Sequence, residues 1–298
     1  MVQKVGVMAL DTFSSMLSFF PVIGLATLGG FLCQKSGVWN IAVEGMMAFG
    51  TFSGIFAYYY FGQSIWLSLF FGFLLGLVFG LVLSILCVHF NLDQIVVGFG
   101  FWFISEGLAG FLYFTLLPSV RVSETFEPKL LSLDPMFYFT LASFAVLYFL
   151  FKNTKQGLAI IATGENPKAA DVAGIDVYKV RFLSTMLGSA FIGLAGSYLS
   201  LVVLQGFTYK MVAGYGWTAF ALILFGRWTT SGIFFGSLFF TFLIGVQIRL
   251  QVMSILFLPL EFMVILPHIG VIIVLALAGI FGRKAGMPAS LGVPYQRE

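Results

Sequence analysis

Four acidic residues stand within or beside long apolar stretches of the chain: Glu44, Asp93, Glu106 and Glu261. A carboxylate at the centre of a bilayer costs roughly 2.5–3.5 kcal/mol on insertion scales, so each such acid needs a polar partner or a wet cavity. Glu106 lies deepest within its apolar stretch. For Glu44 and Glu106 the sequence leaves two roles open, a structural hydrogen-bonded role and the lining of a solute pathway. Asp93 and Glu261 are expected at the membrane interface.

Further polar side chains accompany these acids. Asn40 precedes Glu44 by four residues, so the two share one face of a helix. Gln94 belongs to a polar patch at the edge of an apolar run, and Trp217 ends a glycine-rich entry into another. We expect a passage for a small solute to be lined by these residues: Asn40, Glu44, Gln94, Glu106 and Trp217.

Residue patterns for catalysis or metal binding are missing from the sequence. His89 and His268 are the two histidines, and neither belongs to a His-Glu-x-x-His metal site. There is no Gly-x-Ser-x-Gly nucleophile elbow and no phosphate-binding Gly-x-x-x-x-Gly-Lys loop. Cys33 and Cys87 fall inside apolar runs and are expected to pack as free thiols. The sequence therefore predicts no catalytic residue, no metal and no cofactor bound by this chain. If ATP drives the protein, another chain must bind the ATP and its magnesium.

One polar segment carries a set of helix caps. Asn166 is a good N-cap, Pro167 suits the first helical position, and Gly174 can end a helix in the left-handed conformation. The predicted helix has about two turns, so it needs support from the rest of the chain or from a partner. It has a face of small residues: Ala169, Ala170 and Ala173. Such a knob suits a groove on another protein, and an ordinary capped loop helix is the alternative that the residues leave open.

The elements that position these residues must be membrane helices. Of the 298 residues 60% are hydrophobic and only 9% are charged, and the mean hydropathy is +1.03. A soluble domain carries about 25% charged residues, so a water-facing surface cannot be built here, whereas a lipid-facing one can. The net charge of +3 is too small to indicate nucleic-acid binding. The apolar runs are continuous and do not alternate, which favours helices over a barrel.

The apolar runs predict an all-α integral membrane protein with about nine transmembrane helices, between eight and ten, in one domain over residues 1–298. A span needs about 20 apolar residues. The expected spans are 13–33, 42–61, 65–88, 95–117, 135–151, 182–204, 209–227, 231–249 and 266–282. The stretch 250–265 is broken by Pro259 and Glu261, so we expect a re-entrant or interfacial piece there.

Basic residues predict the orientation. With the amino terminus outside, ten of the 15 Lys and Arg residues fall on the cytoplasmic side and five on the other, as the positive-inside rule requires. Two long connections follow from this topology. The loop 118–134 is extracytoplasmic, and the loop 152–181, with five basic residues, is cytoplasmic and contains the capped helix.

The sequence also suggests an internal repeat. The span 13–33 and its glycine-rich exit correspond to the span 182–204 and the glycines before Trp217. Five spans separate the two pairs, so the repeats would have inverted topology. Glycine-interrupted segments at matching places in two halves point to a midplane pathway in transporters. The general richness of membrane helices in glycine, of which this chain has 34, is the alternative.

Four blocks in order along the chain resemble permeases of the branched-chain amino acid, ribose and nucleoside type of ABC importer. They are residues 36–47 (SGVWNIAVEGMM), 164–175 (GENPKAADVAGI), 214–219 with 225–228 (GYGWTA and FGRW), and 288–295 (PASLGVPY). The last block is similar to the end of the shorter of two paired nucleoside or simple-sugar permeases. Trp39 departs from the pattern, where a smaller aromatic or aliphatic residue is expected, and it would narrow the cavity.

The resemblance implies a role and a set of partners. The chain would be a permease subunit in a bacterial or archaeal plasma membrane, importing nucleosides or simple sugars. Its partners would be a cytoplasmic ATPase subunit, a second and longer permease forming a heterodimer, and an extracellular substrate-binding lipoprotein. The segment that couples to the ATPase would comprise Gly164, Glu165, Asn166, Pro167, Ala169, Ala170, Ala173 and Gly174. The rival hypothesis, from the residues alone, is an ion-coupled secondary transporter that uses Glu44, Asp93 or Glu106.

Overall fold

The computed structural model describes residues 17–117, 121–122, 133–253, 265, 267–270, 272 and 286–297. Apart from isolated bridge residues, this part of the chain contains helices and no β-strand. The helices are α2 (Phe20–Lys35), α3 (Val43–Tyr60), α4 (Ile65–Ser84), the π-helical turn η1 (Ile85–His89), α5 (Gln94–Leu116), α6 (Pro135–Asn153), α7 (Lys155–Glu165), α8 (Pro167–Val172), α9 (Val177–Tyr198), the π-helical turn η2 (Leu199–Val203), α10 (Tyr215–Phe225) and α11 (Thr230–Met253). The predicted all-α class is confirmed.

Five of these helical stretches are long and apolar enough to cross a membrane. They are Ile65–His89, Gln94–Leu116, Pro135–Asn153, Val177–Val203 and Thr230–Gln251. Shorter helices, α2 with 16 residues and α10 with 11, lie in two further predicted spans. The predicted span 266–282 falls mostly outside the described residues, so the count of nine stays a prediction.

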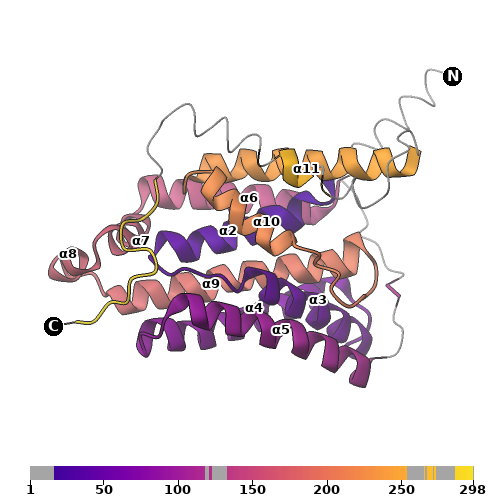
Figure 1. Ribbon diagram of the computed structural model, residues 1–298, viewed down its shortest axis with the longest axis horizontal. Coiled ribbons are helices and arrows are strands. Elements are labelled where there is room, and N and C mark those ends of the chain that lie inside the picture. Colours follow the sequence, from indigo (N-terminus) through magenta and orange to yellow (C-terminus); the bar gives the residue numbers. More distant parts are fainter. Residues whose placement is uncertain are drawn as a thin grey trace, which may run out of the picture.

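Helix α2 forms the centre of the bundle. Figure 1 shows it between a layer that contains α6 and α11 and a layer that contains α9, α4, α5 and α3. Fifteen of its 16 residues are buried. A helix that is apolar all round and enclosed by other helices belongs in the core of a membrane bundle and not at its lipid surface.

Glycines let the central backbones touch. A Cβ added to Gly29 of α2 would collide with the carbonyl oxygen of Gly188 in α9, and one on Gly50 of α3 would collide with that of Gly193. A Cβ on Gly76 of α4 would stand 2.5 Å from the Ser189 carbonyl oxygen. Small residues at such crossings give the close packing that holds membrane helices together. We call these contacts the glycine seam.

Contacts between helix ends define the two ends of the bundle. At one end, Gly164 of α7 packs on the Lys35 carbonyl at the end of α2, and α8 projects (Figure 1). At the other end, the Tyr60 hydroxyl donates a 3.0 Å hydrogen bond to the Leu116 carbonyl, which joins the ends of α3 and α5. We call these the α8 end and the Tyr60 end. The α8 end is the one that the basic residues predict to be cytoplasmic.

Several boundaries differ from the sequence prediction. Helix α7 occupies part of the predicted polar loop, and α9 begins at Val177, five residues before the expected 182. Helix α10 begins at Tyr215, because residues 205–214 are not helical, and α11 continues through Met253 into the predicted re-entrant stretch. The loop 118–134 and the residues Pro259 and Glu261 lie wholly or largely outside the described residues. Cys33 and Cys87 are buried free thiols, as expected.

Candidate solute pathway and coupling surface

Glu44 joins the beginnings of two helices. It lies in the first turn of α3, and its carboxylate accepts hydrogen bonds from the backbone N–H groups of Gly214 (2.8 Å), Gly216 (2.7 Å) and Trp217 (3.2 Å) at the start of α10. The first N–H groups of a helix have no intrahelical partner, and the positive end of the helix dipole favours an anion there. The acid that the sequence placed in the membrane is therefore stabilised by α10. We call this contact the Glu44 junction.

Two glycines make the junction possible. Gly214 has φ +90°, a left-handed conformation that favours glycine, and it starts α10. A Cβ on Gly216 would stand 2.5 Å from the Glu44 Cα and 2.7 Å from its carboxylate. The pattern Gly-Tyr-Gly thus lets a helix terminus approach the acid without a side chain between them.

The junction lies inside the bundle, about a third of the way along α5. Gly45, next to Glu44, packs against the backbone of Trp102, which is the ninth of 23 residues in α5. That position is about 12 Å along a helix of about 35 Å. From the junction, α3 runs to Tyr60 at the Tyr60 end. Helix α10 runs the other way, since the Trp228 indole beyond its last residue donates a 2.7 Å hydrogen bond to Gln34 near the end of α2. The starts of α3 and α10 therefore meet inside the bundle, and the two helices diverge from there.

Asn40 and Gln94 hold the non-helical linker before α3. The Asn40 Oδ1 accepts from the Ala42 N–H at 3.0 Å, and the side chain is fully buried. The Gln94 Oε1 accepts from the Trp39 N–H at 2.6 Å, and Gln94 is also buried. Both predicted pathway residues therefore brace the linker that leads to Glu44.

Glu106 and Trp217 lie beside the same junction. Glu106 is half-buried in α5 and follows Ser105, which packs against Gly45 next to Glu44. It borders a small cavity with the segment 207–212. The Trp217 ring is partly exposed and lies 5.1 Å from the Trp102 ring, centroid to centroid. The structure thus brings all five predicted pathway residues to one region, two of them as buried braces.

The capped helix forms where the sequence predicts it. Helix α8 begins after Asn166, whose Oδ1 accepts from the Ala169 N–H at 3.1 Å, and Gly174 has φ +85°. Its face differs from the predicted one in one residue. Ala170 is 3% exposed and packs against Val177 and Tyr295 of this chain, so it points inward.

The outward face of α8 is formed by residues on either side of Ala170. Ala169 and Ala173 are exposed, and Val172 is 91% exposed. An apolar side chain so fully exposed on a rigid knob is suited to contact with another protein. The remaining residues of the predicted coupling set hold α8 in place. Gly164 contacts α2, and the exposed Glu165 accepts from the Ala289 N–H at 3.2 Å.

A segment comprising residues 286–297 crosses the α8 end, and we call it the C-terminal strap. The Ser290 N–H donates to the Gly164 carbonyl at 3.0 Å, and the Gly292 N–H donates to the Gly37 carbonyl at 3.1 Å. The strap therefore connects α7 directly to the linker that precedes α3.

Arg181 fastens the strap from beneath. It is 2% exposed and donates to the Val293 carbonyl (2.9 Å) and the Ser290 hydroxyl (3.3 Å). Gly37, with φ +95°, leaves room for the guanidinium, because a Cβ there would stand 2.8 Å from it. A buried charge is costly unless it is hydrogen-bonded, so this arginine is an anchor. The sequence reading counted it only as a cytoplasmic charge.

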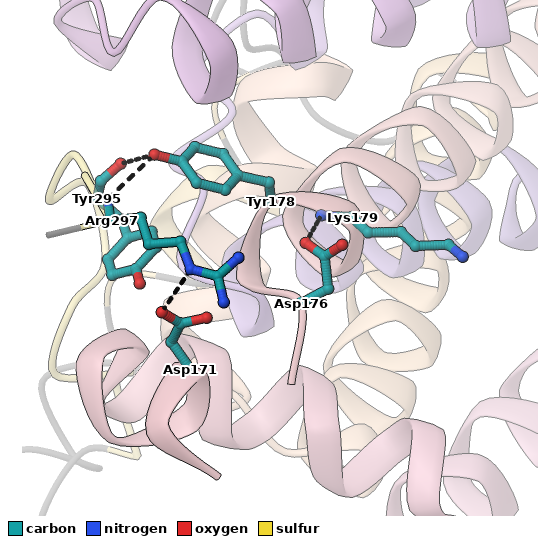
Figure 2. A network of polar contacts seen from close by, with 6 residues as sticks. All are labelled: Asp171, Asp176, Tyr178, Lys179, Tyr295 and Arg297. Carbon is teal, nitrogen blue, oxygen red and sulfur yellow. Dashed lines mark hydrogen bonds and ion pairs between the residues drawn. The ribbon is translucent and has the colours of Figure 1, made fainter. Parts of the chain in front are cut away.

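Tyrosines and an ion pair complete the contact of the C-terminal strap with helices α8 and α9 (Figure 2). The Tyr178 hydroxyl donates to the Tyr295 carbonyl at 3.2 Å and accepts from the Arg297 N–H at 3.3 Å. The Arg297 guanidinium lies 3.2 Å from the Asp171 carboxylate of α8. The sequence does not predict these contacts, because they join residues more than 100 positions apart.

The chain matches the family described as branched-chain amino acid transport system / permease component over residues 12–282. It belongs to this permease family. It is 30% identical over 299 residues to the guanosine ABC transporter permease protein NupQ of Bacillus subtilis, covering 92% of each chain. It is 30% identical over 306 residues to the nucleoside ABC transporter permease protein NupC of Lactococcus lactis, covering 95% of each. A putative glucose ABC transporter permease protein, TsgC13 of Haloferax volcanii, is 32% identical over 254 residues, 78% of this chain and 76% of its own. No solved structure gave a significant match.

These matches decide the general role. The chain is a multi-pass membrane permease of an ABC importer. Permeases of this kind work with ATPase and substrate-binding partners. The resemblance that the four sequence blocks carried is confirmed at the level of the family.

Proposed function

We propose that this permease forms part of the path by which nucleosides, or related simple sugars, enter the cell, driven by a separate ATPase that holds the ATP and magnesium. The observation that carries the proposal is the Glu44 junction, a polar contact between the starts of two helices inside the bundle. Helix N-termini that point at one region within the membrane are typical of solute sites in transporters. Glu106 and Trp217 would border the passage, while Asn40 and Gln94 would brace it.

The architecture supports a specific assembly. We infer nine spans with the amino terminus outside, the connection 152–181 in the cytoplasm and 118–134 outside, within a single domain. The opposite courses of α3 and α10 away from the Glu44 junction support an inverted repeat. A second, longer permease would complete the passage as a heterodimer, and an extracellular lipoprotein would deliver the solute.

The structure also suggests how ATP binding would reach the passage. Val172 and Ala173 of α8 would dock in a groove of the ATPase. A displacement of α8 would be passed to α7, and from Gly164 to the Lys35 backbone. The C-terminal strap supplies a second connection, from Gly164 to Gly37. Both routes end on the linker that carries Trp39 and leads to Glu44.

The test is uptake by the complete transporter in vesicles, with the proton and sodium gradients collapsed by ionophores. We expect labelled nucleoside to accumulate with ATP and not with ADP, and a Glu106→Gln variant to remain ATP-driven. The matched control is the same complex with a hydrolysis-deficient ATPase. Uptake that stops when the gradients are removed, or that proceeds without the ATPase, would refute the importer and favour the ion-coupled alternative with Glu106 as proton carrier.

A further inference from the structure

Five aromatic side chains from three segments gather beside the Glu44 junction, and we call them the aromatic cluster. They are Trp39 of the linker, Phe99 and Trp102 of α5, and Trp217 and Phe220 of α10. The Trp102 and Trp217 rings meet edge to face at 5.1 Å, and Phe99 lies 6.1 Å from both. Trp39 and Phe220 are parallel to within 6°, with centroids 6.5 Å apart.

The rings are not fully covered by the described residues. Phe99 is 38% exposed, and the other four are partly exposed. Trp102 lies about a third of the way along α5, and Trp39 lies next to Gln94 at the start of α5, toward the α8 end. The aromatic cluster therefore extends from the Glu44 junction toward the predicted cytoplasmic side, along the passage proposed above.

Three donor atoms in this region have no hydrogen-bond partner among the residues that the structure describes. They are the indole Nε1 atoms of Trp39 and Trp102 and the amide Nε2 of Gln94, and all three are buried. Gln94 itself is only 2% exposed, and its Oε1 is already used by the Trp39 backbone. Buried polar groups are normally hydrogen-bonded, so each of these unused donors calls for an acceptor from outside the described residues.

Resting on the proposed function, we infer that the aromatic cluster is a stacking site for the base of a nucleoside. A nucleobase has a flat π face for the rings, and its ring nitrogens and carbonyl oxygens are the acceptors that unpaired N–H groups require. A simple sugar lacks this flat π face, and the hydroxyl groups that it offers are present on the ribose of a nucleoside as well. The site therefore favours nucleosides over ribose or glucose.

The experiment compares nucleoside and ribose uptake in the same vesicles, using the complete transporter with ATP. The variants are Trp217→Ala, which removes a ring, and Trp217→Phe, which keeps one. The matched control is Phe149→Ala on α6, an exposed ring outside the cluster. Loss of one base–aromatic stack is expected to lower nucleoside uptake at subsaturating concentration by about 5- to 150-fold. Ribose uptake should fall far less than nucleoside uptake, co-purification of the ATPase should not change, and Trp217→Phe should retain most nucleoside uptake.

The outcomes are separable. If Trp217→Ala lowers nucleoside uptake no more than Phe149→Ala, or if Trp217→Phe is as impaired as Trp217→Ala in an assembled complex, the stacking site is wrong. An equal fall of ribose and nucleoside uptake in Trp217→Ala also overturns it. If wild-type vesicles take up no ribose, nucleoside uptake is divided by the amount of assembled complex, and the value for Trp217→Ala is compared with that for Trp217→Phe. Wild-type uptake that does not depend on ATP refutes the proposed function instead.

Discussion

Replacement of Glu44 by glutamine removes the charge at the Glu44 junction while it keeps the shape of the side chain. Glutamine has one acceptor oxygen, so at best it keeps the two bonds from Gly216 and Trp217, now without charge. Its amide NH₂ would face the Gly214 N–H, donor against donor. A hydrogen bond to a charged group contributes about 1.5–3 kcal/mol and a neutral one about 0.5–1.5 kcal/mol. One lost bond of about 2 kcal/mol and two weakened by about 1 kcal/mol each give a loss of about 4 kcal/mol.

A loss of that size shifts the equilibrium toward a detached α10 several hundredfold, at about 1.4 kcal/mol for each factor of ten. We expect Glu44→Gln to lower the melting temperature of the purified permease complex in detergent and to abolish ATP-driven uptake. Glu106→Gln is the matched control, because it removes the same charge from a half-buried acid that makes no hydrogen bond within the described residues. Wild-type melting and uptake in Glu44→Gln, or an equal effect of Glu106→Gln, would refute the reasoning.

Three further outcomes follow from the packing. Val172→Arg is expected to prevent ATPase co-purification without affecting the melting temperature. Ala170→Arg, at a site buried within this chain, should lower both the co-purification and the melting temperature. Equal melting temperatures of the two variants would contradict the assigned faces of α8. Arg181→Leu removes two of the hydrogen bonds that hold the C-terminal strap, and should make the strap about tenfold more susceptible to limited proteolysis, with uptake lost. Unchanged cleavage would show that the strap holds without Arg181. Gly76→Ala places a methyl group 2.5 Å from a backbone oxygen and should clearly lower the melting temperature. The control Gly100→Ala meets no atom within 4 Å and should leave the melting temperature unchanged or slightly raised. Similar melting curves for the two variants would argue against the glycine seam.

Local signals explain what the sequence predicts well. The capped helix appears between Asn166 and Gly174 because each cap acts on backbone groups two to four residues away. The apolar runs also mark most helices correctly, since each run meets the same apolar surroundings along its length. Helix α7 was missed because its residues are less apolar than those of a span, and it is placed by its packing on α2 and on the C-terminal strap.

Contacts between residues far apart in the chain explain what the sequence does not predict. The bond between Glu44 and Gly216 joins residues 172 positions apart, so no local pattern reveals that the acid meets a helix start. The sequence therefore left two roles open for Glu44, and the geometry favours the hydrogen-bonded one. The inward position of Ala170 depends on Tyr295, 125 residues later, and the periodicity of α8 alone does not give it. The same holds for Arg181, for which the sequence predicts only a cytoplasmic charge, because its partners Ser290 and Val293 lie more than 100 positions later.

The glycine seam limits which parts of the permease can change shape during a transport cycle. Where Gly29 meets Gly188, and Gly50 meets Gly193, backbone touches backbone, and no layer of side chains can rearrange to absorb a new crossing angle. Helices α2, α3 and α9 are therefore expected to travel as one rigid body. Helix α10 differs at its start, where three hydrogen bonds to a single carboxylate hold it and can open and close, whereas its later residues Ala219, Leu222 and Ile223 are packed in the core. Alternation between outward and inward access would then be a hinge at the start of one short helix, turning against a block that does not deform.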